Sequence, residues 1–176
     1  IEIIGWDLFS GCAHTEIGII YKQKPSTLPK IAGGNFNYVN LLNQNNKIIG
    51  KVYDLGISNF MEKLFGGRIE HLSTYDALFS ESKMSVIKKG RAALSRLQYP
   101  LELDQEYKAI YISYLRKFEQ YIIPFVIKED NIAFINILAK LGAIKKENIY
   151  NHIEHAMKLN RFEILIFLFD FLHKNL

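Results

Sequence analysis

DNIAFINILAKLG (residues 130–142) and NRFEILIFLFDFL (residues 160–172) are two versions of one pattern, and they decide how the second half of the chain folds. Ile135 in the first stretch aligns with Leu165 in the second, at an offset of 30 residues, and both are expected in the core. The segments that precede the two stretches match at the same offset. A unit of two short helices that recurs at a fixed distance predicts a stack of helix pairs, here over about residues 118–173.

Each unit of this repeat is expected to hold a first helix, a tight turn and a second helix. The first helices are assigned to residues 124–128 and 148–159, and the second helices to residues 131–141 and 161–172. Gly142 follows the earlier second helix, where a glycine adopts the left-handed geometry of a C-cap at little cost.

The repeat resembles the ankyrin family, whose units of about 33 residues also hold two short helices. LAKLGA (residues 138–143) is similar to the end of that family's second helix, where leucines precede Gly-Ala, and a weaker unit is expected in residues 103–122. The family's Thr-Pro-Leu-His signature is absent from both units. The resemblance implies a surface that binds another protein. A plain helical bundle with chance similarity is the alternative.

The composition is that of a folded globular protein. Of the 176 residues, 49% are hydrophobic and 23% are charged, which predicts a packed core in one domain or two small ones. The net charge of +4 is a mild excess, so nucleic acid is not an expected partner. No apolar stretch reaches the roughly 18–20 residues of a membrane-spanning helix, and no membrane span is expected.

Cysteine usage bears on the compartment. Cys12 is the single cysteine, so no internal disulfide can form, and this favours a reducing compartment such as the cytoplasm. The chain begins with Ile1 instead of Met, and no signal-peptide pattern follows. We therefore expect that residue 1 is not the start of the gene.

The first hundred residues predict an α+β region. Three stretches have the composition of strands, namely EIGIIY (16–21), GNFNYVN (34–40) and KIIGKVYDLG (47–56). The NQNN tract (43–46) predicts a turn that joins the last two in a hairpin. A helix is expected over residues 81–97, before Pro100. The predicted fold class is therefore α+β, with a small antiparallel sheet in residues 1–100 and stacked ankyrin-like helix pairs in residues 101–176.

A candidate catalytic pair lies in the strand region. DLFSGCAHTEIGIIYK (7–22) places His14 at the start of one predicted strand, and Asp54 ends a later one. A strand holds an imidazole rigidly, and an acceptor on the neighbouring strand fixes its tautomer. KVYDLGISNF (51–60) resembles a strand-Asp-Gly segment of papain-like, YopT-like cysteine proteases. The resemblance implies that His14 is a general base and that Asp54 orients it.

The nucleophile of such a site is not evident. A papain-like nucleophile lies on an upstream helix N-terminus, whose dipole lowers the thiol pKa, and no such helix precedes His14. On a strand, Cys12 and His14 would be about 6.5–7 Å apart, too far for a hydrogen bond. In a tight turn they would meet, and SGC (10–12) resembles the Ser-Gly-Cys of CNF-type glutamine deamidases. Either the nucleophile lies outside this chain, or the site is incomplete.

Other site chemistry has little support. Gly33-Gly34 and Gly66-Gly67 are isolated pairs without the spacing of a nucleotide-binding loop. His152 and His155, expected on the surface or in a groove, and His173 lack neighbours at metal-ligand spacing. No metal and no cofactor are therefore expected.

The basic helix over residues 83–96 is a separate candidate. Five of its residues are basic, with no acid among them: Lys83, Lys88, Lys89, Arg91 and Arg96. Such a patch can meet phosphate or an acidic protein, and the alternative is an ordinary solvated face.

Three hypotheses for the function follow. The combination resembles host-directed bacterial effectors that join a cysteine protease or deamidase domain to ankyrin repeats. The resemblance implies a module that binds another protein, which is expected to be a host protein. The expected location is the cytoplasm, either of the cell that makes the protein or of a host cell that receives it. The rival is a papain-like cysteine protease or deamidase that uses His14 and Asp54 with a nucleophile outside this chain. The third is a structural or viral interaction protein with no active site.

Overall fold

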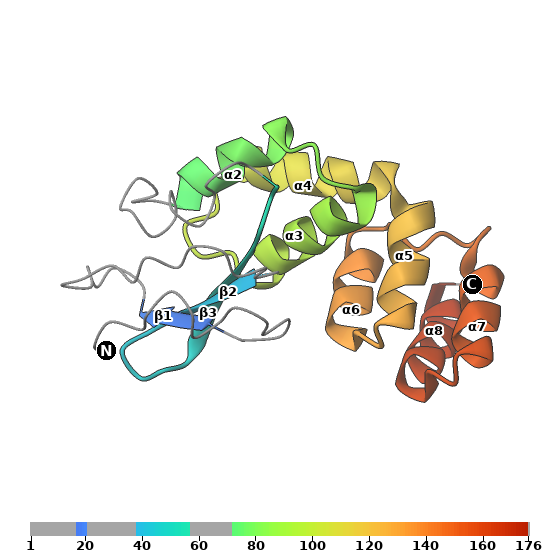
Figure 1. Ribbon diagram of the computed structural model, residues 1–176. Helices are drawn as coiled ribbons and strands as arrows, with labels where there is room; N and C mark the ends of the chain where they lie inside the picture. The colour runs from blue at the N-terminus through green and yellow to red at the C-terminus, as the bar shows by residue number, and fades with distance from the viewer. Residues whose placement is uncertain (1–16, 21–37, 57–71, 176) are drawn as a thin grey trace. The chain divides into compact units, whose positions relative to one another are not determined.

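The computed structural model describes residues 17–20, 38–56 and 72–175 (Figure 1). The chain forms two compact units. The first comprises Ile1–Met84 and Tyr99–Tyr107, and the second comprises Ser85–Gln98 and Lys108–Leu176. Strands lie in the first unit, and the long series of helices lies in the second.

The first unit contains a sheet of three strands, β1 (Ile17–Ile20), β2 (Tyr38–Leu42) and β3 (Ile48–Tyr53), in the order β1-β2-β3. β2 and β3 form the predicted antiparallel hairpin. In its turn, the side-chain Oδ1 of Asn43 accepts the backbone N–H groups of Asn45 at 3.0 Å and Lys47 at 2.9 Å. Asparagine is favoured in turns because its side chain makes such bonds.

The first strand differs from the expectation of an antiparallel sheet. β1 pairs with β2 in parallel, with Ile17 opposite Val39 and Ile20 opposite Leu42. Two parallel neighbours cannot be joined by a tight hairpin and need a longer crossover. Residues 21–37, with two prolines, provide that length, although their course lies outside the described residues.

A helix covers the end of this hairpin. α2 (Leu72–Glu81) carries Tyr75, which is fully buried. The Tyr75 hydroxyl donates to the carbonyl oxygen of Tyr53 at 3.0 Å and accepts its N–H at 3.3 Å. Just beyond the helix, the hydroxyl of Ser82 donates to the carbonyl of Leu55 at 2.7 Å. Two side chains of the helical segment therefore hold the backbone at the end of β3.

The helix predicted over residues 81–97 is wrong at its start. α2 ends at Glu81, and the next helix, α3, spans Val86–Gln98. The hydroxyl of Ser85 accepts the N–H of Lys88 at 3.4 Å, which is the contact of an N-cap. A serine cap thus starts α3 after a four-residue break.

The second unit is built from α3, most of α4 (Gln105–Lys117), and two helix pairs. The first pair is α5 (Glu119–Lys128) and α6 (Ile132–Lys140), and the second is α7 (Ile149–Lys158) and α8 (Phe162–Asn175). α3 packs against α5 and α6, which in turn pack against α7 and α8 (Figure 1). The first pair therefore has helices on two sides.

The 30-residue repeat predicted from the sequence is confirmed by the helix bounds, although α5 begins at Glu119, five residues before the predicted start of that helix at residue 124. α5 and α7 each have ten residues and begin 30 residues apart, as do the starts of α6 and α8. Buried positions follow the same offset, because Phe134 and Ile164 are both buried, as are Leu138 and Leu168. The expected α+β fold class is likewise confirmed, with the small sheet followed by the helices. The ankyrin resemblance itself stays an expectation.

Leu165 departs from its counterpart in the repeat. Ile135 is fully buried, whereas Leu165 is only half-buried. The first pair is covered by α3 on one side and by the second pair on the other, while the described residues cover the second pair on one side alone. Equivalent sequence positions therefore differ in burial because their neighbours differ.

Candidate functional site

The predicted catalytic residues are only partly described. His14 and Cys12 lie outside the described residues, so their roles stay predictions. Asp54 directly follows β3, as expected. Its Oδ1 accepts the N–H of Gly56 at 2.8 Å, and Gly56 has a φ of 66°. The carboxylate of Asp54 thus stabilises a tight turn at the end of the strand.

The basic helix α3 is not a uniformly solvated face. Arg96 is buried, with 1% of its surface exposed. The guanidinium of Arg91 pairs with the carboxylate of Glu129 and lies 4.8 Å from the centre of the Phe125 ring. Burial lowers the pKa of Lys89, which lies over the ring of Tyr114. Several of the basic side chains therefore pack within the helical unit instead of forming a free patch for phosphate.

A buried polar pair lies between α5 and α7. His152 and Glu119 are each only 8% exposed, so the expectation that His152 lies on the surface is wrong. Burial lowers the pKa of the His152 imidazole, an effect that the nearby Glu119 charge opposes and His155 reinforces. Lys145 Nζ lies 2.5 Å from Oε1 of Glu119. The repeat has isoleucines at the counterpart positions 122 and 149, so polar side chains replace apolar ones here.

This pair lacks the further groups that chemistry would need. Within residues 17–20, 38–56 and 72–175, no three His, Cys, Asp or Glu side chains gather as they would around a metal ion. A carboxylate beside an imidazole can hold or exchange a proton, but covalent catalysis also needs a nucleophile. Because Oε2 of Glu119 has no hydrogen-bond partner among the described residues, we describe His152 and Glu119 as two buried polar groups of the helix stack and assign no reaction to them.

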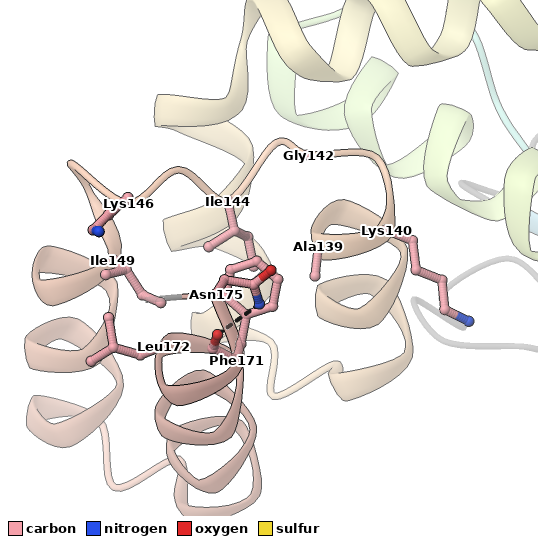
Figure 2. Close-up of a pocket in the computed structure, with 9 residues that line it drawn as sticks. All are labelled: Ala139, Lys140, Gly142, Ile144, Lys146, Ile149, Phe171, Leu172 and Asn175. Carbon is pink, nitrogen blue, oxygen red and sulfur yellow. Dashed lines mark hydrogen bonds between the residues drawn. The ribbon is translucent and has the colours of Figure 1, made fainter.

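A hollow of about 330 Å³ opens where the ends of α6 and α8 meet the start of α7 (Figure 2). Its lining combines apolar side chains, among them Ile144, Ile149 and Phe171, with polar ones. Figure 2 shows Lys140 and Lys146 on opposite sides, with their ammonium groups turned outward. Asn175 also lines the hollow, and its side-chain N–H donates to the carbonyl of Phe171 at 2.8 Å, so the lining is mixed and indicates no particular ligand.

Exposed apolar side chains gather on the helix pairs. Seven large hydrophobic residues are exposed in the described part of the chain, and six of them lie in α5, α7 and α8. They are Tyr121, Tyr150, Met157, Phe162, Ile166 and Phe169. We call these six residues the array surface. Single exposed hydrophobic residues are ordinary, whereas a contiguous apolar patch marks an interaction site; these six residues are carried by three helices of the two pairs.

A comparison of the two repeat units in the sequence already indicates the three residues of the array surface that lie on α8. Phe162, Ile166 and Phe169 replace Ile132, Asn136 and Ala139 of the first unit. Two of the three changes put a large apolar side chain where the first unit has a small or polar one. Burial could not be inferred from the sequence, because both sets keep helical spacing.

Comparison of the chain with protein-family models, curated proteins and solved structures finds no match. The ankyrin-like and papain-like resemblances therefore rest on the residues quoted for them. None of the helices in the described ranges is long and apolar enough to cross a membrane.

Proposed function

We propose that the helix pairs form an ankyrin-like module that binds another protein. The observation that carries this proposal is the array surface, since α5, α7 and α8 carry six of the seven exposed large hydrophobic side chains of the described residues. Aromatic residues and methionine are enriched in protein interfaces, where they supply large contact areas. Stacked helix pairs are a common scaffold for such surfaces.

The first helices of the pairs offer the edge that a target would contact. Gln120 and Tyr121 on α5 occupy the same repeat positions as Tyr150 and Asn151 on α7. All four residues are exposed, and the two tyrosines are 55% and 62% exposed. Each unit therefore presents one tyrosine and one amide side by side, a combination of apolar contact and hydrogen bonding that suits a protein partner.

The resemblance to host-directed effectors extends the proposal to the target. In that form the target is a host protein, and the module acts inside the host cell. No observation on the described residues favours a second function. A protease or deamidase that uses His14 and Asp54 stays a prediction, because His14 lies outside the described residues.

A crosslinking experiment tests the protein-binding function. A photoreactive amino acid in place of Tyr150 would trap a bound protein, which is then identified, purified and titrated against the parent chain. We expect the Tyr121→Ala/Tyr150→Ala variant to bind it at least about tenfold more weakly, since tyrosines are common interface hot spots. Lys140→Ala, an exposed position on α6, is the control and should retain the parent affinity. Equal affinity of the tyrosine variant and the parent would refute the proposal.

A further inference from the structure

The two helix pairs meet where α5 packs against α7, and this contact is polar toward the starts of the two helices. α5 contributes Glu119 and α7 contributes His152, and both side chains are buried. The other buried residues of the two helices are apolar, namely Ile122, Ile123, Val126, Ile127, Ile149, Ile153 and Ala156. We call Glu119 and His152 the polar joint.

The polar groups of this joint are incompletely paired. Oε1 of Glu119 lies 2.5 Å from Nζ of Lys145, in the segment between α6 and α7. Oε2 of Glu119 is buried and has no hydrogen-bond partner among the described residues. A buried acceptor without a partner weakens the contact in which it lies, because water would bind that acceptor in an open form. The polar joint is therefore easier to open than the apolar remainder of the contact.

Protonation of the imidazole would place a further charge in the joint. Burial lowers the pKa of His152, the Glu119 charge opposes this effect less strongly, and His155 on the same helix reinforces it. α8 also packs against α7, but its ionisable side chains are exposed, namely Glu163, Asp170, His173 and Lys174. As the pH falls below 6.5, the proton therefore favours a form in which water reaches His152.

A second connection joins the pairs at the other ends of these helices. Arg161, directly before α8, donates from one terminal nitrogen to the carbonyl of Lys128 at 2.8 Å. Its other terminal nitrogen lies 3.6 Å from Oδ2 of Asp130. The guanidinium stays charged in acid and the carbonyl does not titrate. Acidification therefore acts on the polar joint and leaves the Arg161–Lys128 contact in place as a hinge.

We propose that protonation of His152 opens the contact between the starts of α5 and α7, while Arg161 keeps the turns of the two pairs together. The second pair is free to move because the described residues cover it on one side alone. Tyr121 and Tyr150 lie on opposite sides of the joint, so opening moves these two tyrosines apart. A loss of target binding in acid rests on the proposed function, whereas the opening itself does not.

Distances between two nitroxide spin labels test this opening. In a Cys12→Ser chain, Gln120→Cys/Asn151→Cys places the labels at exposed positions of α5 and α7 beside the polar joint. Electron paramagnetic resonance should give one short distance at pH 7 and a second, longer distance at pH 5. Lys128→Cys/Lys158→Cys is the matched control, because these exposed positions are equivalent in the repeat and lie at the hinge end. Its distance should be the same at both pH values.

Variants of the histidine assign the effect. His152→Gln does not titrate and should abolish the longer distance at pH 5, whereas His173→Gln should respond as the parent does. His152→Ile replaces His152→Gln if circular dichroism shows that the glutamine variant is unfolded. An unchanged distance in the parent at pH 5, or a longer distance that persists without His152, would overturn the proposal. Equal lengthening in the control pair would refute the hinge at Arg161. No target is present, so this result is independent of the crosslinking test.

Discussion

Asp130 and Asn160, which lie 30 residues apart, have the same left-handed backbone conformation, with φ angles of 57° and 55°. Each ends the turn between the two helices of a pair. The N–H of Asp130 donates to the carbonyl of Ile127, and that of Asn160 donates to the carbonyl of Met157, both at 3.0 Å. The two units therefore share one turn geometry as well as one helix spacing.

Replacing Asn160 with valine should destabilise the protein. The left-handed conformation costs an ordinary residue about 1–2 kcal/mol, and a β-branched side chain tolerates it least. We expect Asn160→Val to lower the free energy of unfolding by about that amount in urea denaturation. Asn151→Val on the exposed face of α7 is the control, since valine and asparagine have similar helix propensities. Equal stability of the two variants would show that the turn is not strained.

The buried histidine predicts a pH dependence of stability. Burial lowers the pKa of His152 in the folded protein below its ordinary value of 6.5. As the pH falls below 6.5, the unfolded chain therefore binds this proton before the folded chain does, and stability is lost. Above pH 6.5 the His152 imidazole is neutral in the folded and in the unfolded chain, so its protonation no longer reduces the free energy of unfolding. We expect denaturation experiments at pH 5 and pH 7 to show the loss.

His152→Ile tests the source of that dependence. Isoleucine occupies the counterpart position 122 in the first repeat, so the substitution restores an apolar contact between α5 and α7. The loss of stability between pH 7 and pH 5 should become smaller than in the parent. His173→Gln, at an exposed site on α8, should leave the loss unchanged. An unaltered pH dependence in His152→Ile would assign the effect to other groups.

Two leucines of α8 should differ in their contribution to stability. Leu168 is fully buried and Leu165 is half-buried. Leu168→Ala should lower the free energy of unfolding by about 2–5 kcal/mol, because it leaves a cavity. Leu165→Ala should lower it by about 1 kcal/mol. Since both changes are leucine to alanine in one helix, helix propensity cancels. A larger loss at Leu165 would indicate that a further element covers it in solution.

The chain alone should have no cysteine hydrolase activity. A reactive thiolate needs a helix N-terminus or a paired imidazole. No helix is predicted before Cys12, and its spacing from His14 is wrong for a pair on a strand. A thiol-reactive probe at neutral pH should therefore label Cys12 at the rate of an ordinary thiol, and His14→Ala should not change that rate. Cys12→Ser serves as the blank. Fast labelling that is lost in His14→Ala would establish a Cys–His pair.

Local spacing was enough to predict the helix pairs and the hairpin. Helical periodicity and the 30-residue offset depend only on the order of residues, and the turn at Asn43 depends on a side chain that bonds to its own backbone neighbours. The sequence did not predict the start of α3, because nothing in it shows that the Ser85 hydroxyl accepts the N–H of Lys88. A serine can stand within a helix or cap it.

The sequence by itself determined the period, the turns and the fold class of this protein. Tertiary structure alone decided the direction of β1, the burial of Arg96 and His152, and the exposure of Phe162, Ile166 and Phe169. The physical reason is that these properties depend on which elements come together. An apolar stripe has the same spacing whether another helix covers it or water does, and a charged side chain is buried only where its neighbours surround it.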